Sequence, residues 1–263
     1  MTPSRPLMFL TSGLLALGLA LTGCAGAGAS DPAGASGAGG DAVTAAASEV
    51  SRTDSGAVIP SGYVDGAVTL VRGTDGVGLV TDTAALGDTP VVSEWFDLHC
   101  PYCAMFADLH GSTFEGLLDS GDAALGLYPM AFLDDHSAGD AYSTRGAVLL
   151  AAIADSGQGA AWWPTLQGLM GAQPESGTGM SDARMLEIAT EAGVDTTAAL
   201  SSFPDLTVEQ ALAQKVFADY VAEPAQAAFH SGIEQVPTVK VGGAEVTSIG
   251  DATAFDAEPH ALL

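Results

Sequence analysis

The stretch Val91-Val92-Ser93-Glu94-Trp95-Phe96-Asp97-Leu98-His99-Cys100-Pro101-Tyr102-Cys103 decides the fold. Its first six residues are mostly apolar and predict a short strand, and apolar residues with helical spacing follow from Cys100 to about residue 118. Two cysteines separated by two residues at a strand-to-helix junction are typical of thiol–disulfide exchange. The stretch therefore predicts a redox pair, Cys100 and Cys103, at the start of a helix.

The third cysteine, Cys24, has a separate explanation. Residues 7–21 form an apolar run that is too short and too rich in Gly and Ala for a comfortable membrane span, and Arg5 precedes it. The run ends in Leu21-Thr22-Gly23-Cys24, which resembles the bacterial lipoprotein box. That resemblance implies a signal peptide over residues 1–23 and lipid on Cys24, whereas the alternative is an ordinary signal peptide with a chance cysteine. We expect an extracytoplasmic protein, lipid-anchored to the cell membrane, in a compartment where disulfides persist.

Composition separates a tether from a domain. Residues 24–57 are mostly Gly, Ala, Ser and Asp, so we expect a disordered tether. Residues 58–263 have the length of one domain with a sizeable core. The chain has 7 Lys and Arg against 32 Asp and Glu, a net charge of −25, which argues against nucleic acid and anionic lipid as partners.

The order of the expected elements predicts an α/β fold. Residues 76–81, 90–96 and 123–130 read as strands, and a helix between the last two makes them parallel. Helices are expected over 142–154, 162–170, 181–192 and 207–229, with Ser181 as a cap and an interruption near Pro224, and a hairpin over 236–243 and 244–249. Gly111 could mark a kink in the first helix. Trp162 and Trp163 are expected in the core, with the lining of a peptide groove as the alternative. This order predicts a thioredoxin-like fold, a central mixed sheet flanked by helices, with a helical insertion at about 133–230.

These motifs resemble the DsbA-like branch of the thioredoxin superfamily. The resemblance covers most of residues 75–250 and is carried by Cys100-Pro101-Tyr102-Cys103, by Glu94 and by Val236-Pro237-Thr238. Gln173-Pro174-Glu175 is similar to the corresponding part of Gram-positive members, though less specific. The resemblance implies a thiol–disulfide oxidoreductase whose redox pair works without a cofactor.

The helix N-terminus makes Cys100 the expected nucleophile. Unpaired N–H groups and the helix dipole there favour a thiolate, and Pro101 begins the helix without wasting an N–H. Cys103 lies one turn further and is expected to be the resolving thiol. A zinc site is the alternative, but it needs two more ligands at suitable spacing, and no second CxxC exists.

Residues near the pair could tune its chemistry. Glu94 interrupts an apolar strand, and the resemblance implies a buried carboxylate that exchanges a proton; an edge or outward position is the alternative. Asp97 is expected to be exposed. His99 could donate a hydrogen bond or positive charge to the thiolate, or could be a solvated loop residue. Tyr102 within the dipeptide leaves the redox potential open.

Pro237 is expected to follow a cis peptide bond, with a trans proline at a strand start as the alternative. The resemblance implies that this loop lies against the cysteine pair and that the backbone of Val236 pairs with an extended substrate. Val236 is an apolar residue like that of oxidising members of the family.

The expected activity is the introduction of disulfides into reduced or unfolded exported proteins, with a membrane redox partner reoxidising the pair. A reductase or isomerase would use the same residues. A non-catalytic envelope lipoprotein that binds a partner through its thioredoxin-like domain is the alternative from another class.

Overall fold

The computed structural model describes residues 52–80, 83–174, 177–199, 210–212, 217–251, 254–255, 259 and 263. All of them lie in the compact unit that spans Ser48–Leu263, whereas the export segment and Cys24 lie outside the described residues. Residues 52–57, expected to belong to the tether, are part of this unit, because Arg52 pairs with Val58 and Ala57 is buried in the core. In the described ranges, no helix has both the length and the apolar character needed to cross a membrane.

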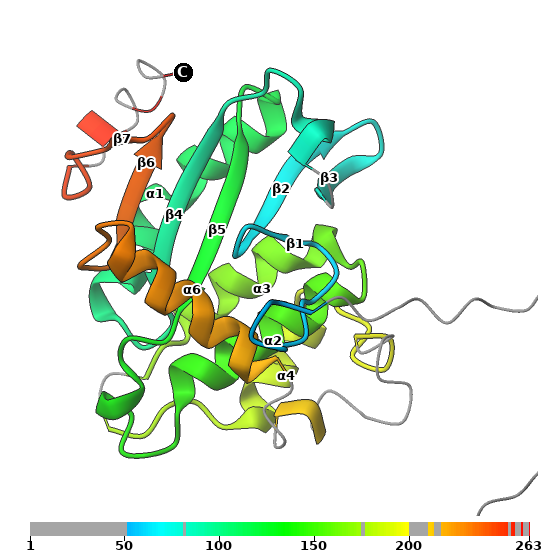
Figure 1. Cartoon of the computed structure of the whole chain (residues 1–263), viewed down its shortest axis with the longest axis vertical. Coiled ribbons are helices and arrows are strands. Elements are labelled where there is room, and N and C mark those ends of the chain that lie inside the picture. Colours follow the sequence, from blue (N-terminus) through cyan, green and yellow to red (C-terminus); the bar gives the residue numbers. More distant parts are fainter. Residues whose placement is uncertain are drawn as a thin grey trace, which may run out of the picture. The chain divides into compact units, whose positions relative to one another are not determined.

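A mixed sheet forms the centre of the unit (Figure 1). Its strand order is β1-β2-β5-β4-β6-β7, with β3 paired to β2; β4 and β5 are parallel, and the other pairs are antiparallel. The strands are β1 (Tyr63–Val64), β2 (Ala67–Gly73), β3 (Gly76–Leu79), β4 (Val91–Asp97), β5 (Ala124–Met130), β6 (Thr238–Val241) and β7 (Ala244–Glu245). The predicted mixed sheet is confirmed, although the sequence did not indicate β1 and β2.

Five helices and two short 3-10 turns in the described residues connect the strands. They are α1 (Pro101–Ser120), α2 (Tyr142–Asp155), α3 (Gly159–Gly171), α4 (Asp182–Glu191) and α6 (Ala218–His230), with short 3-10 turns η1 (Thr83–Leu86) and η2 (Asp134–His136). The Ser181 hydroxyl caps α4 by accepting from the N–H of Arg184, as expected. Most of the helical insertion between β5 and β6 is therefore visible, whereas 200–209 and 213–216 lie outside the described residues.

Neither Gly111 nor Pro224 ends the helix in which it lies. Gly111 lies inside a continuous α1, where a Cβ would come within 3.1 Å of the Gln167 side chain of α3, so its role is close helix packing. Pro224 lies inside α6 without ending it. Its ring packs against the β1–β2 turn, since a Cβ on Gly66 would be 3.4 Å from Cγ of Pro224. That tertiary contact helps to hold the proline in a helix that its missing N–H would weaken.

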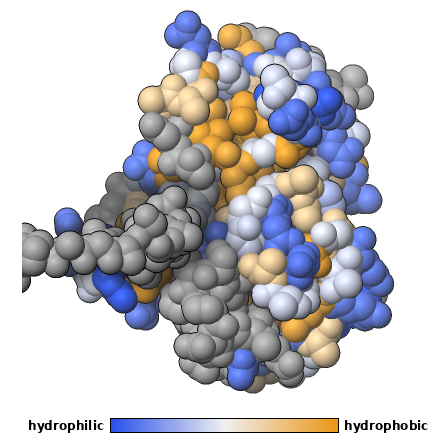
Figure 2. Space-filling view, turned by 90° about the vertical axis from the view of Figure 1, so that its right-hand side faces the viewer, coloured by the Kyte–Doolittle hydropathy of each residue, from blue (hydrophilic) through white to orange (hydrophobic). Residues whose placement is uncertain are grey.

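The two faces of the sheet are covered differently. Val92, Glu94 and Phe96 of β4 are buried on the face that carries α1, while Trp95 is half-buried on the opposite face, which α6 crosses. Figure 1 shows α6 in front of the sheet and α1 behind it. Figure 2 faces the side on which β2 and β3 lie in Figure 1, and hydrophobic surface gathers in its upper half. The main core lies between the sheet and helices α1, α2 and α3, and it includes the buried Trp162.

Gly146 of α2 allows this helix to pack against the loop that precedes the cysteine pair. A Cβ at Gly146 would lie 2.2 Å from Cδ1 of Leu98, which is itself buried. We predict that Gly146→Ala lowers the free energy of unfolding by about 1–3 kcal/mol, because the added methyl group would force the buried Leu98 side chain to shift. Gly116→Ala in α1 is the matched control: nothing lies near its Cβ, and we expect a gain of about 0.5–1 kcal/mol. Urea denaturation measures both, and equal effects of the two substitutions would contradict the packing argument.

Candidate active site

The cysteine pair lies between the end of β4, at Asp97, and the first turn of α1, which begins at Pro101. Cys100 has extended backbone angles and occupies the N-cap position, Pro101 begins the helix, and the N–H groups of Cys103 and Ala104 donate to the carbonyl of Cys100. Both cysteines are buried, and their thiols are not joined in a disulfide. The structure therefore shows the reduced pair with Cys100 at the end of the helix and Cys103 beneath it.

The two thiols titrate very differently. A hydrogen bond from the Cys103 thiol, supported by the N–H groups of Cys103 and Tyr102, lowers the pKa of Cys100 to about 7, although burial opposes this shift. Burial raises the pKa of Cys103 far above its ordinary value, and its hydrogen bond to Cys100 acts in the same direction. Cys100 is therefore the thiol that ionises near neutral pH, with Cys103 as its proton-bearing donor.

The loop before β6 closes the site. The peptide bond between Val236 and Pro237 is cis, as the sequence analysis predicted. The thiol of Cys100 donates to the carbonyl oxygen of Val236 at 3.6 Å. Thr238, which follows Pro237, pairs with Trp95 of β4. Sheet pairing therefore places the loop directly against the sulfur of Cys100.

Glu94 lies on the inner face of β4, so the alternative of an outward position is wrong. It is buried, and burial raises its pKa to about 8. It lines a narrow cavity together with Phe106, Phe114 and Trp163. Its charge, when present, raises the pKa of Cys103. Glu94 is thus a carboxyl group that carries a proton at neutral pH within electrostatic reach of the resolving thiol.

Asp97, expected to be exposed, is fully buried. Its Oδ1 accepts from the N–H of His99 at 2.8 Å and from the hydroxyl of Ser143 at 2.6 Å, and its Oδ2 accepts from the N–H of Leu133 at 3.0 Å. Burial raises the pKa of Asp97, whereas these three hydrogen bonds lower it. The donor His99 is local, but Leu133 just before η2 and Ser143 in α2 lie far along the chain, so the sequence near Asp97 does not indicate its burial.

Gln173, just after α3, holds the active-site loop from the other side. Its amide nitrogen donates to the carbonyl of Leu98 at 2.8 Å and to that of Cys100 at 3.0 Å. The second carbonyl belongs to the N-cap residue itself. The sequence indicated Gln173 only as part of a weak family resemblance, and its contact with the redox loop emerges from the position of α3.

His99 does not contact either thiol through a hydrogen bond in the part of the chain that the structure describes. Its ring packs edge-on against Tyr142, with the centroids 5.6 Å apart, and its Nδ1 is buried without a partner there. The forces that lower the pKa of Cys100 come from Cys103 and Tyr102 instead. The tuning role expected of His99 therefore stays a prediction without a contact behind it.

An apolar strip lies on α1 beside the pair. Tyr102 is 70% exposed, Met105 58% and Leu109 44%, and their spacing places them along one side of the helix. Pro101 is exposed at the start of the same strip. Large apolar side chains that gather on the surface beside the cysteine pair are typical of an interaction site.

The chain is similar to known proteins in sequence pattern and in fold. The family model described as Thioredoxin matches residues 83–257. The chain is similar to reduced DsbA from Mycobacterium tuberculosis, at 25% identity and a TM-score of 0.54, over 75% of this chain and 100% of that one. MdbA of Actinomyces oris, a thiol-disulfide oxidoreductase, is similar at 18% identity, TM-score 0.56, over 72% and 81% of the two chains. Oxidised BdbD of Bacillus subtilis is similar at 16% identity and a TM-score of 0.55, over 78% of this chain and 97% of that one. No curated protein sequence matches the chain.

A CxxC pair at the N-terminus of a helix, on a thioredoxin-like sheet with a helical insertion, defines a thiol–disulfide oxidoreductase of the DsbA type. Because the family model covers more than half of the chain, the chain belongs to the thioredoxin family, in its DsbA-like branch. The resemblance, the fold class and the enzyme class expected from the sequence are confirmed.

The raised pKa of Glu94 predicts a fall in stability with pH. The folded value of about 8 exceeds the ordinary value of 4.5, so this group favours the folded state below pH 4.5 and loses that effect as pH rises through 8. We expect Glu94→Gln, which cannot ionise, to flatten this decline, by up to about 1.4 kcal/mol for each unit of pKa shift. Urea denaturation of the reduced parent and of reduced Glu94→Gln from pH 4.5 to 8.5 measures the free energy of unfolding of each. Glu245→Gln, at an exposed site, is the control; a parallel decline in Glu94→Gln would show that Glu94 is not the cause.

The thiol–thiol hydrogen bond predicts the behaviour of two substitutions at Cys103. Cys103→Ala removes the donor, so we expect the pKa of Cys100 to rise from about 7 toward its ordinary value of 9.0. Cys103→Ser keeps a hydroxyl donor, and the pKa should rise less. Ultraviolet absorbance of the thiolate during a pH titration measures both, and an unchanged pKa in Cys103→Ala would assign the shift to the backbone N–H groups alone.

Proposed function

We propose that this protein introduces disulfides into exported proteins outside the cytoplasm, with Cys100 as nucleophile and Cys103 as resolving thiol. The observation that carries the exchange chemistry is the hydrogen-bonded thiol of Cys100 at the N-terminus of α1, with a pKa lowered to about 7, since the thiolate is the form that exchanges disulfides. The oxidising direction is supported by Val236 beside that sulfur, an apolar residue like that of oxidising members of the family.

The reaction begins with the oxidised pair. A thiolate of the substrate attacks Sγ of Cys100, the bond between Cys100 and Cys103 breaks, and Cys103 leaves and takes up a proton. A second substrate thiolate then attacks the substrate sulfur of the mixed disulfide. The substrate disulfide forms and Cys100 leaves as a thiolate. Two electrons have passed from the substrate to the pair.

Glu94 is suited to supply the proton to Cys103. Its pKa of about 8 keeps it protonated at neutral pH, and the high pKa of Cys103 means that this sulfur requires a proton as it leaves. The reverse step, reoxidation, needs the same group to take the proton back. Glu94 thus has the protonation state that the resolving half of the cycle requires.

The substrate is an unfolded chain in this proposal. The strip of Tyr102, Met105 and Leu109 offers apolar contacts beside Cys100. The loop of Val236 and Pro237 lies against the same sulfur, and displacement of the Cys100 thiol from the Val236 carbonyl would free a backbone acceptor for an extended substrate. His99 and Pro101 lie on either side of Cys100 in the sequence and border the same surface.

The location outside the cytoplasm is supported by the sequence alone. The apolar run that ends in Leu21-Thr22-Gly23-Cys24 supports export and a lipid anchor on Cys24. In that setting a membrane redox partner would reoxidise the pair after each cycle. Cys24→Ser should release the protein from membranes, and a membrane-bound Cys24→Ser protein would contradict the anchor.

A reductase is the second candidate, and one observation favours it. The pKa of Cys100, about 7, equals the value of about 7 for thioredoxin rather than that of about 3.5 for DsbA. The same contacts would then pass electrons from the pair to a substrate disulfide.

The reduction potential separates the two directions. Equilibration with glutathione is expected to give a value closer to about −120 mV than to about −270 mV if the protein is an oxidase, and the reverse would identify a reductase. We predict that Cys100→Ser abolishes oxidation of a reduced test protein. Cys103→Ser should instead form a mixed disulfide with the oxidised form of the test protein, because its Cys100 thiolate can attack that disulfide and the variant has no second thiol to release the product; mass spectrometry detects the adduct. Oxidation of the test protein at the parent's rate by Cys100→Ser would show that Cys100 is not the nucleophile and would overturn the proposal.

A further inference from the structure

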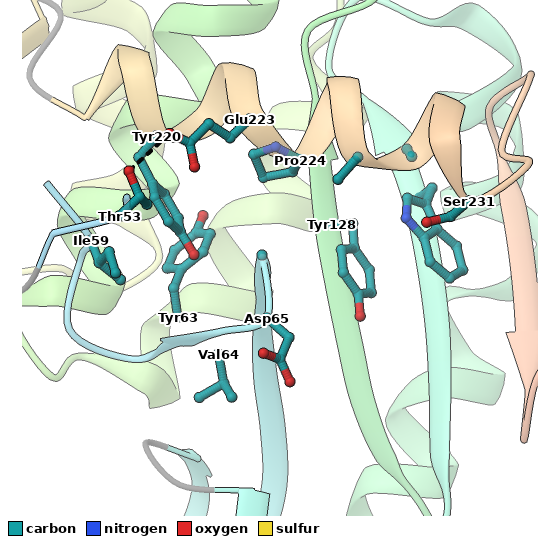
Figure 3. A pocket seen from close by; sticks show the side chains of 14 residues that line it. Thr53, Ile59, Tyr63, Val64, Asp65, Tyr128, Tyr220, Glu223, Pro224 and Ser231 are labelled. Atoms are coloured by element: carbon teal, nitrogen blue, oxygen red, sulfur yellow. Dashed lines mark hydrogen bonds between the residues drawn. The ribbon is translucent and has the colours of Figure 1, made fainter. Parts of the chain in front are cut away.

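A second cavity lies away from the cysteine pair, on the face of the sheet that α6 crosses. Its volume is about 630 Å³, and it opens between α6, the β1–β2 turn and the ends of β4 and β5 (Figure 3). Neither cysteine nor Pro237 lines it. A cavity of this size is large enough for a small organic ligand.

Aromatic rings make up much of the wall. Trp95 and Tyr128 stack with their centroids 4.5 Å apart, and Tyr63 and Tyr220 meet edge to face at 5.5 Å. Lys240 already places its ammonium 5.5 Å from the Trp95 ring. Aromatic rings attract cations through their electron-rich faces, as the contact of Lys240 with Trp95 illustrates.

Carboxylates supply the charge. Asp65 and Glu223 line the cavity, whereas Lys, Arg and His are absent from its described lining. Glu223 accepts hydrogen bonds from the hydroxyls of Thr53, at 2.9 Å, and Ser55. Burial, followed by the charges of Glu223 and Asp65, raises the pKa of Tyr220 to about 12. The tyrosine therefore stays neutral while both acids keep the cavity negative.

One buried hydroxyl in the wall lacks a partner. Tyr63 is 6% exposed, and its oxygen has no hydrogen-bond partner in the part of the chain that the structure describes. A buried polar atom without a partner costs about 1–3 kcal/mol. Figure 3 shows its hydroxyl directed toward α6, beside Tyr220.

The cavity is elongated along the helix. Tyr220, Glu223, Pro224, Ala227 and Ala228 of α6 line it. The eight steps from Tyr220 to Ala228 correspond to about 12 Å of helix. Both acids lie within electrostatic reach of Tyr220, whereas Trp95 packs in a cluster with Ala228, so the two ends differ in character.

We propose that this cavity binds an organic cation, an amine or guanidinium carried on an apolar body. The charged group would lie between Asp65, Glu223 and the tyrosine rings, and the apolar part would extend along α6 toward Trp95. Such a group could belong to a small molecule or to an Arg or Lys side chain of a peptide. The site is separate from the redox pair and stands independently of the direction of electron flow.

Calorimetric titration of the purified protein tests the proposal with matched probes. Choline is compared with its neutral isostere 3,3-dimethylbutanol, and an acetylated Ala-Arg-Ala amide is compared with the citrulline peptide. Each cation is expected to bind at least about tenfold more tightly than its neutral match. Binding of choline alone would assign the site to small molecules, and binding of the Arg peptide alone would assign it to side chains. Either result supports the site, whereas no binding, or equal binding of charged and neutral probes, overturns it.

Substitution of the acid locates the site. Asp65 has a φ of 51°, a conformation that Asn also tolerates, so Asp65→Asn should keep the fold. We expect it to weaken cation binding by about tenfold and to leave disulfide exchange unchanged. Asp108→Asn, an exposed acid on α1 outside the cavity, removes the same charge and should bind as the parent does. Equal losses in both variants would show a general charge effect and would contradict the site.

Discussion

The hydrogen bond between the two thiols at the start of α1 is the interaction on which the rest of the site depends. It lowers the pKa of Cys100 to about 7 and requires Cys103 to remain protonated. Burial of Cys103 guarantees that protonation, because a thiolate there would be desolvated. The surrounding sheet and helices bury Cys103 completely and place Cys100 at the N-terminus of α1.

Three segments far apart in the sequence hold that helix end in place. Asp97 joins the end of β4 to η2 and α2 through its buried carboxylate. Gln173 fixes the carbonyls of Leu98 and Cys100. Val236 offers its carbonyl to the thiol from the loop before β6. The helical insertion thus contributes directly to the geometry of the redox pair as well as covering the core.

The two faces of the sheet carry different chemistry. On the face of α1, Glu94 is buried among aromatic side chains and keeps its proton at neutral pH. On the face of α6, Trp95, the next residue, helps to line the aromatic, acidic cavity. The alternation of side chains along one strand therefore separates a proton donor for disulfide exchange from a site proposed for cations.

The sequence by itself determined the redox pair, the helix that follows it, the parallel β4–β5 unit and the proline loop, because these depend on local spacing and on a family motif. It could not determine the burial of Asp97, the contacts of Gln173 or the packing of Gly111 and Pro224. Those depend on which distant helix lies against each residue. Pairs such as Gln173 and Cys100 meet only when α3 packs beside α1, so tertiary structure decides them.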